Sequence, residues 1–192
     1  MCKERKEPFI AVTNRALSRH PYLEQIERIA KRKPKAILLR EKDLSEEAYE
    51  DLAKEVKMIC DRHGIRLICH NYPAVAERLG ISALHLPLTK LREYAACEHE
   101  KKLELGCSVH AVEEAEEAER LGVSYLVAGH IYATDCKKGL PPRGLSFLRE
   151  VCSNVTVPVY AIGGIGFADG RIEEVCKNGA KGACIMSEVM KL

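Results

Sequence analysis

The sequence contains no tryptophan, and only 5% of its 192 residues are aromatic. It also lacks any apolar run near the ~20 residues needed to span a bilayer, so no membrane partner is expected. Neither sign of charge dominates, because 30 Lys and Arg residues face 28 Asp and Glu residues, a formal net charge of +2. Nucleic-acid-binding domains carry a basic patch or stripe, and the sequence shows no such stripe. We therefore expect a protein that binds neither nucleic acid nor membranes.

The chain has nine cysteines but no C-x-x-C pair, which argues against a zinc knuckle. Cys69, Cys107 and Cys184 lie inside apolar runs, where a reduced cysteine packs as a small apolar side chain. The first residues lead into a short strand rather than the apolar region of a signal peptide. A reducing, cytoplasmic location is therefore expected. Cys136 lies in a polar loop instead, and we interpret it as a spectator thiol.

Short apolar runs alternate with helical patterns along the whole chain, and 46% hydrophobic content is enough for one sizeable core. The apolar runs predict buried parallel strands at 9–12, 36–39, 65–69, 83–86, 105–109, 125–128, 155–162 and 182–186. Apolar stripes predict helices at 21–31, 45–63, 74–79, 111–121, 145–151 and 172–178, and the charged stretch 89–101 is compatible with another.

Eight strands alternating with helices, with no break in composition, predict one domain over residues 1–192 folded as an α/β protein, a closed (β/α)8 TIM barrel. An open, doubly wound sheet is the alternative, although its usual G-x-G-x-x-G fingerprint after the first strand is missing. Only residues 188–192 follow the last strand, so the eighth helix is expected to be short or missing. Either the chain is truncated, or a second subunit covers that face, as in a homodimer.

Two turns at the ends of late strands have the features of a phosphate site. Gly163 and Gly164 follow the seventh strand, and Met186 and Ser187 follow the eighth. In barrels these two loops commonly bind phosphate through backbone amides. A tight turn with a capping serine is the other interpretation of the same residues.

A second set of polar residues follows earlier strands. Arg40 and Lys42 are two positions apart, which on a strand puts both side chains on one face, and at a barrel mouth they would bind a second anion. The alternative is a solvated strand end. Asn71 and Ser108 end neighbouring strands and could supply neutral hydrogen bonds.

Four histidines stand at or near strand ends: His70, His85, His110 and His130. A metal site needs three convergent imidazoles or carboxylates, and acidic residues at strand ends are scarce, so no metal is expected. His85 and His110 are interpreted as packed or structural. His130 follows Gly129 at the end of the sixth strand, between the two predicted anion sites, where it could transfer protons near neutral pH. A structural histidine is the alternative.

The segment AGHIYATDCKKGLPPRGLSFL, followed by VPVYAIGGI, resembles the thiamine phosphate synthase superfamily, and in particular its TenI branch, the thiazole tautomerases. Shorter matches are LLREK on the second strand, CSVHAVEEA on the fifth and CIMS at the end. The resemblance covers nearly the whole chain. It implies an isomerase of thiamine biosynthesis that converts a carboxythiazole phosphate into its aromatic tautomer without a cofactor.

The synthase branch of this superfamily joins a pyrimidine pyrophosphate to a thiazole phosphate and needs Mg²⁺. Its third strand ends in Asn-Asp, and an acidic residue follows its fourth strand. Here Tyr72 follows Asn71, no carboxylate follows His85, and His130 replaces the usual proline. Because Mg²⁺ needs oxygen ligands, these departures favour the tautomerase. A synthase, or a non-catalytic binder of thiazole phosphate, remains the alternative.

For that reaction, the positions of the site residues suggest an expected role for each. Gly163, Gly164, Met186 and Ser187 would bind the substrate phosphate. The carboxylate would lie between Arg40 and Lys42. Lesser contacts are expected from Asn71, Ser108, Thr134 and Lys137, with Lys137 either over the site or in an exposed loop. His130 would carry the proton.

Overall fold

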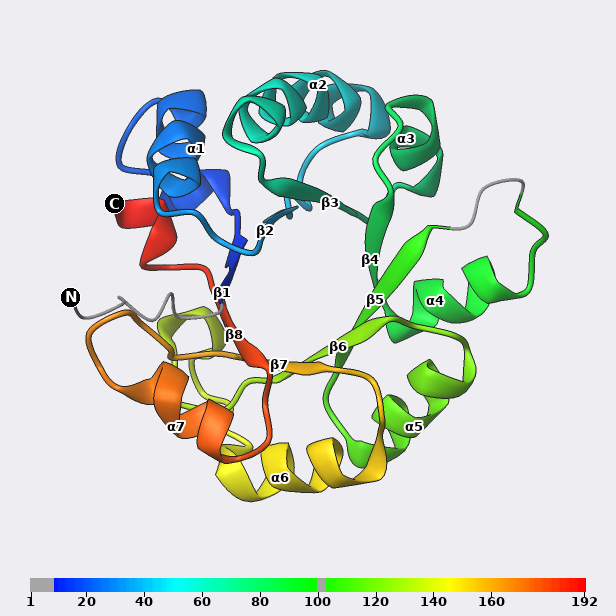
Figure 1. Ribbon diagram of the computed structural model, residues 1–192, viewed down its shortest axis with the longest axis vertical. Helices are drawn as coiled ribbons and strands as arrows, with labels where there is room; N and C mark the ends of the chain where they lie inside the picture. Colours follow the sequence, from blue (N-terminus) through cyan, green and yellow to red (C-terminus); the bar gives the residue numbers. More distant parts are fainter. Residues whose placement is uncertain (1–8, 100–102) are drawn as a thin grey trace.

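Eight parallel strands form a closed barrel in the computed structural model, which describes residues 9–99 and 103–192 (Figure 1). The strands are β1 (Phe9–Val12), β2 (Ala36–Leu39), β3 (Arg66–His70), β4 (Ala83–Pro87), β5 (Glu104–Val109), β6 (Tyr125–Gly129), β7 (Val159–Ile162) and β8 (Gly182–Ile185). Each strand pairs with the next in sequence, and β8 closes the barrel by pairing Cys184 with Ile10 of β1. The closed TIM barrel predicted from the sequence is confirmed.

A ring of helices surrounds the strands (Figure 1). The α-helices are α1 (Tyr22–Lys31), α2 (Glu46–His63), α3 (Pro73–Arg78), α4 (Leu88–Ala95), α5 (Val112–Arg120), α6 (Gly144–Asn154) and α7 (Arg171–Lys177). Helix α2 illustrates how local sequence determines where a helix begins and ends. Its N-cap Ser45 accepts a hydrogen bond from Ala48 N at 3.3 Å, and Gly64 ends it with a left-handed φ of 63°.

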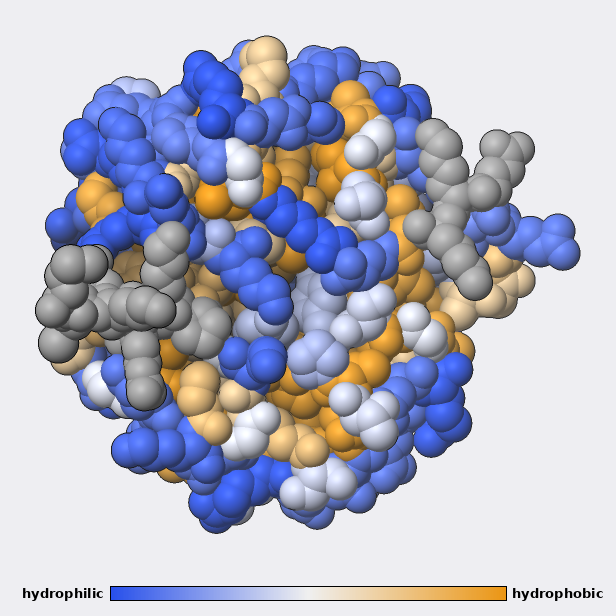
Figure 2. Space-filling view, in the orientation of Figure 1, coloured by the Kyte–Doolittle hydropathy of each residue, from blue (hydrophilic) through white to orange (hydrophobic). Residues whose placement is uncertain are grey.

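The buried residues form two clusters, one on each side of the strands. The larger lies between strands and helices, and Figure 2 shows apolar residues between the barrel centre and a hydrophilic outer ring. The smaller fills the barrel interior and includes Ile10, Val12, Leu38, Tyr125 and Tyr160. Strand residues alternate between the clusters, as the two-residue period of a strand requires.

Two predicted elements differ from the structure. The seventh strand begins at Val159 instead of residue 155, because α6 continues to Asn154 and the next residues bind elsewhere. The amides of Thr156 and Val157 donate to Glu119 Oε1 at 2.6 and 3.0 Å, so they do not join the sheet. The helix compatible with the stretch 89–101 is α4, which begins one residue earlier and ends at Ala95, and residues 100–101 of that stretch lie outside the described part of the chain.

The eighth helix is reduced to one 3-10 turn, η3 (Val189–Lys191), as the short C-terminus predicted. This turn lies beside α1 (Figure 1). Val189 and Met190 are fully buried, and Gln25 Nε2 donates to the Val189 carbonyl at 2.7 Å. The segment therefore occupies part of the space between α1 and α7. Among the described residues, no helix has the length and apolar character needed to cross a membrane.

Candidate active site

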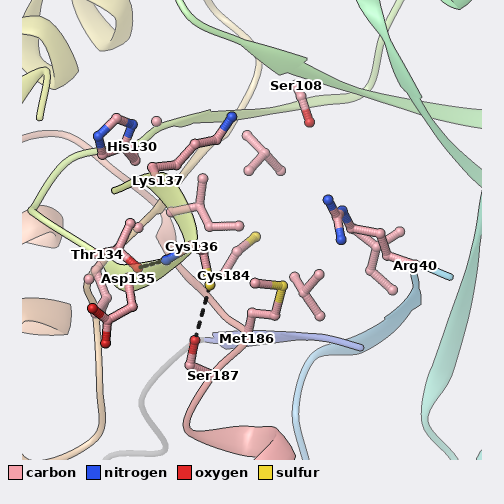
Figure 3. Close-up of a pocket in the computed structure, with 18 of the residues that line it drawn as sticks. Arg40, Ser108, His130, Thr134, Asp135, Cys136, Lys137, Cys184, Met186 and Ser187 are labelled. Carbon is pink, nitrogen blue, oxygen red and sulfur yellow. Dashed lines mark hydrogen bonds between the residues drawn. The ribbon is translucent and has the colours of Figure 1, made fainter. Parts of the chain in front are cut away.

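A cavity of about 1140 Å³ opens at the carboxyl ends of the strands. Every site residue that the sequence singled out lines this cavity: Arg40, Lys42, Asn71, Ser108, His130, Thr134, Lys137, Gly163, Gly164, Met186 and Ser187. They meet because the carboxyl ends of parallel strands share one rim of a barrel. Figure 3 shows Arg40 facing the cavity across from His130, with Ser187 on a third side.

Arg40 and Lys42 follow β2 in a loop rather than on the strand, yet both line the cavity. Between them, Glu41 turns away and is only 2% exposed. Its carboxylate accepts hydrogen bonds from Thr13 Oγ1 at 2.7 Å, Tyr22 OH at 2.9 Å and Arg15 N at 2.9 Å. This anchoring of Glu41 holds its two cationic neighbours toward the cavity.

The positive charges of this rim crowd one another. Burial lowers the pKa of the Arg40 guanidinium, and the charge of Glu41 acts in the opposite direction. Burial also lowers the pKa of Lys42, with further contributions from Arg40 and Lys137. A bound anion would offset the burial cost of both cations and the repulsion that Lys42 experiences, so this rim is suited to bind an anion.

Gly163 and Gly164 lie against the segment that follows β6. Ile131 N donates to Ile162 O at 2.9 Å, and Tyr132 N donates to Gly163 O at 3.1 Å. A Cβ at Gly163 would stand 2.3 Å from the Cβ of His130, and one at Gly164 would stand 2.5 Å from Ala133 O. Close approach of two backbones therefore requires these glycines, independently of any ligand.

The glycine turn also offers backbone donors, and both glycines line the cavity. Within the described part of the chain, the amides of Gly163 and Gly164 donate to no protein acceptor. Buried or half-buried amides of this kind need a partner, and an anion in the cavity can supply one. The structure thus accommodates both interpretations of this turn, close packing and phosphate binding.

The loop after β6 reaches over to the end of β8. Cys136 Sγ lies 3.5 Å from Ser187 Oγ, and Thr134 Oγ1 accepts from Cys136 N at 3.4 Å (Figure 3). Thr134 therefore caps its own 3-10 turn, η2 (Asp135–Lys137), which leaves its hydroxyl proton for a further contact. Lys137 extends from this turn into the cavity (Figure 3), yet the residue is exposed, so both placements predicted for it are compatible with the structure.

His130 comes directly after β6 and is half-buried. Its Nε2 lies 3.4 Å from the carbonyl of Leu140, and its own carbonyl accepts from Arg143 N at 2.9 Å. The backbone is thus held by the loop that follows, while the ring borders the cavity next to the glycine turn. An imidazole in that place can exchange protons with a bound molecule.

His70 and His85 line the inner part of the cavity, and sequence reasoning gave neither a role in the site. Their rings are stacked, with centroids 6.2 Å apart. Burial is the main cause that lowers their pKa values, to about 2 for His70 and about 3 for His85. Both imidazoles are therefore neutral at physiological pH. The alternation of inward-facing residues along β3 and β4 is the signal that could have placed them.

His110 is the remaining strand-end histidine, and it is held by the helix that follows it. Its amide donates to Glu114 Oε2 at 2.6 Å, and its Nδ1 lies 3.5 Å from the same oxygen. Its pKa is lowered chiefly by burial, against the opposing effect of Glu114. These contacts tie His110 to α5, although its side chain is 49% exposed and lines the cavity.

The donor set of the cavity does not fit a protein-held magnesium ion. Among the described lining residues, Asp135 is the one carboxylate, its side chain is 96% exposed, and Lys138 Nζ lies 3.8 Å from it. Nowhere in residues 9–99 and 103–192 do three His, Cys, Asp or Glu side chains converge as a metal site. Mg²⁺ prefers carboxylate and phosphate oxygens in octahedral geometry, which these residues do not provide.

Comparison with known proteins shows which family this chain belongs to. Residues 9–189 match the family described as thiamine monophosphate synthase (TMP-TENI). A putative thiamine-phosphate synthase 2 of Aquifex aeolicus is 31% identical over 90% of this chain and 91% of its own. Thiamine-phosphate synthase 2 of Streptococcus pneumoniae is 32% identical over 94% of this chain and 86% of its own. The solved structure of thiamine phosphate pyrophosphorylase from Pyrococcus furiosus superposes with a TM-score of 0.80 at 28% identity, over 96% and 88% of the two chains.

Proposed function

Because this chain belongs to the thiamine monophosphate synthase (TMP-TENI) family, we propose that it is the tautomerase of a carboxythiazole phosphate in thiamine biosynthesis. The observation that carries this proposal is the composition of the cavity. Arg40, Lys42 and Lys137 supply positive charge, His130 supplies a titratable group, and Asp135 is the one carboxylate among the described lining residues. Such a site suits an anionic substrate and a proton transfer.

The substrate would be held at two ends. Its phosphate would accept hydrogen bonds from the amides of Gly163 and Gly164 and from the Met186–Ser187 turn, since helix and turn amides bind phosphate in this way. Its carboxylate would lie between Arg40 and Lys42. Asn71, Ser108, Thr134 and Lys137 would contribute the remaining polar contacts. Contacts at both anionic ends of the substrate would hold its ring in one place. Such positioning lowers the activation barrier of the reaction.

His130 would then move one proton. It removes the proton from the ring carbon that bears the carboxylate, and the electron pair of that C–H bond shifts the ring double bonds. The exocyclic carbon takes a proton back from the imidazolium, so no atom, electron or charge is gained or lost overall. Aromatisation supplies the driving force. General acid–base catalysis of about 10²–10⁴-fold is therefore an adequate contribution.

The second candidate is a thiamine-phosphate synthase, and the names of the similar proteins favour it over the tautomerase. That reaction belongs to the transferases and, by the family resemblance, depends on Mg²⁺. Against it stands the cavity itself, because the described lining residues offer a single exposed carboxylate for the ion. Shared ancestry explains the fold in either case, so the names alone do not choose between the two reactions.

Two assays on the purified protein separate these candidates. One follows aromatisation of the carboxythiazole phosphate tautomer in the presence of EDTA, and the other follows formation of thiamine phosphate from the pyrimidine pyrophosphate, thiazole phosphate and Mg²⁺. We expect turnover in the first and none in the second. Mg²⁺-dependent formation of thiamine phosphate, without aromatisation, would establish the synthase instead. Tight binding of the aromatic product with no turnover in either assay would identify a binding protein.

A further inference from the structure

Three side chains on three adjacent strands form a hydrogen-bonded unit at the wall of the cavity. Strand pairing sets His85 of β4 opposite Gly106 of β5, and Gly106 opposite Tyr125 of β6. Ser108 is the next residue of β5 on the same face, since strand side chains alternate. His85 Nε2 lies 2.8 Å from Ser108 Oγ, and His85 Nδ1 lies 3.1 Å from the Tyr125 hydroxyl. The imidazole thus bridges a cavity-lining serine and a buried phenol.

Gly106 makes the unit possible by leaving space for the tyrosine ring. A Cβ at Gly106 would stand 2.1 Å from Tyr125 Cζ and 2.4 Å from its hydroxyl oxygen. The backbone of Gly106 is not in the left-handed region, so conformational freedom does not explain the glycine. Space for the Tyr125 ring is the remaining physical reason, and it brings the phenol under His85.

The chemistry of the buried phenol decides the direction of both hydrogen bonds. Tyr125 is 5% exposed, and burial raises the pKa of its hydroxyl well above the usual value, so the group keeps its proton. A buried O–H must donate, and within the described residues its hydrogen-bond partner is His85 Nδ1. Because the imidazole is neutral, a lone pair on Nδ1 places the one ring proton on Nε2. Nε2 then donates to Ser108 Oγ.

We propose that His85, oriented by Tyr125, is a positioning residue that fixes Ser108 as a hydrogen-bond donor to an oxygen or nitrogen acceptor of the bound substrate. Ser108 Oγ already accepts from His85, so its own proton is directed to the cavity that it lines. Figure 3 shows the Ser108 hydroxyl facing the interior of the cavity. The substrate in this statement is the one given by the proposed function, whereas the orientation of the imidazole is a property of the protein alone.

The orientation is tested without any ligand. Nitrogen NMR of histidine-labelled protein distinguishes the two neutral tautomers, and we expect His85 to carry its proton on Nε2. Tyr125→Phe keeps the ring in the space beside Gly106 but removes the donor, so this single tautomer should be lost. Tyr160→Phe is the matched control, because that buried hydroxyl bonds to Lys35 Nζ instead. A wild-type His85 protonated on Nδ1 would overturn the proposal, whether or not the protein has tautomerase activity.

The effect on the reaction is tested by a double-mutant cycle. Ser108→Ala and Tyr125→Phe should each lower kcat about 3- to 10-fold, the effect of one neutral hydrogen bond. In the Ser108→Ala background, Tyr125→Phe should lower kcat no further, because the hydroxyl that Tyr125 helps to orient is already absent. Independent, multiplying effects would show that Tyr125 acts only through packing and would refute the coupling. Absence of turnover in the wild-type protein would count against the proposed function. The NMR experiment would still test the orientation of His85, because it needs no substrate.

Discussion

At the scale of single residues, Gly163 packs against His130, the residue proposed to transfer the proton. Its φ of 103° and the 2.3 Å that would separate an added Cβ from the Cβ of His130 both oppose any side chain. We expect Gly163→Ala to lower the free energy of unfolding by more than the ~1–2 kcal/mol of a left-handed alanine and to displace His130. Gly122→Ala is the control, since Gly122 has φ of 85° with no atom within 4 Å. Chemical denaturation of the two variants compares them, and equal losses would show that the contact with His130 is unimportant.

The stacked pair His70 and His85 predicts a pH dependence of stability. Their folded pKa values, about 2 and 3, lie below the ~6.5 of an unfolded histidine. Between these values the unfolded chain binds protons that the folded chain does not. Stability is therefore complete above about pH 6.5 and falls as the pH falls toward 3. Each histidine contributes at most about 2 kcal/mol of loss at pH 5.

Urea denaturation between pH 5 and 7 measures this slope. His70→Asn should reduce it, whereas His99→Gln, a change at an exposed histidine, should preserve it. A wild-type protein equally stable at pH 5 and pH 7 would be incompatible with two neutral buried imidazoles.

The residues that sequence reasoning found and missed differ in one physical respect. Arg40, Ser108 and His130 were found because each lies at or directly after the end of a strand, and strand ends share one rim. The bridge from Tyr125 to His85 was missed, because it depends on the register of β4, β5 and β6. Register joins positions far apart in the chain, and a single sequence does not display it.

At the scale of elements, the loop between β2 and α2 owes its shape to a buried carboxylate. Glu41→Gln would retain acceptors for Thr13 and Tyr22 but present an amide group to the Arg15 N–H. We expect a loss of about 1–3 kcal/mol in unfolding free energy and a higher KM, because Arg40 and Lys42 are then less well held. Asp43→Asn, at the exposed partner of Arg15, should change neither. An unchanged KM in Glu41→Gln would separate this carboxylate from substrate binding.

Element boundaries were predicted where a local signal marks them and missed where a distant contact does. Ser45 and Gly64 cap α2, and the sequence predicted both ends. The start of β7 was placed four residues early, because Val155 and Val157 have strand-forming side chains. Glu119 of α5 accepts hydrogen bonds from the amides of Thr156 and Val157, so the strand begins only after them. Nothing within the segment itself encodes that contact.

At the scale of the whole molecule, the last residues complete the ring of helices. Met190 is fully buried beneath α1, whereas Met58 on α2 is 61% exposed. We expect Met190→Ala to cost about 2–5 kcal/mol, as buried large-to-small changes do. Met58→Ala should change stability by less than about 0.5 kcal/mol. Thermal and urea unfolding measure both, and a stable Met190→Ala protein would show that the terminal turn is dispensable.

The architecture was the most predictable level, because eight alternations of strand and helix admit few other solutions. The reaction was less predictable, since one barrel supports many chemistries and similar proteins bear the synthase name. A subunit interface over the face with the shortened helix, as in a homodimer, remains a prediction for analytical ultracentrifugation. The choice between tautomerase and synthase rests on which side chains line one cavity.

The most direct test of that choice is the rate of aromatisation of the carboxythiazole phosphate tautomer by the His130→Asn protein, measured with product affinity. Loss of the proton carrier should lower kcat by about 10²-fold or more while binding is largely retained, because the anion contacts remain. His110→Asn, at another histidine that lines the cavity, should keep most of the rate. Near-wild-type turnover in His130→Asn would contradict proton transfer by His130, and with it the mechanism proposed for this cavity.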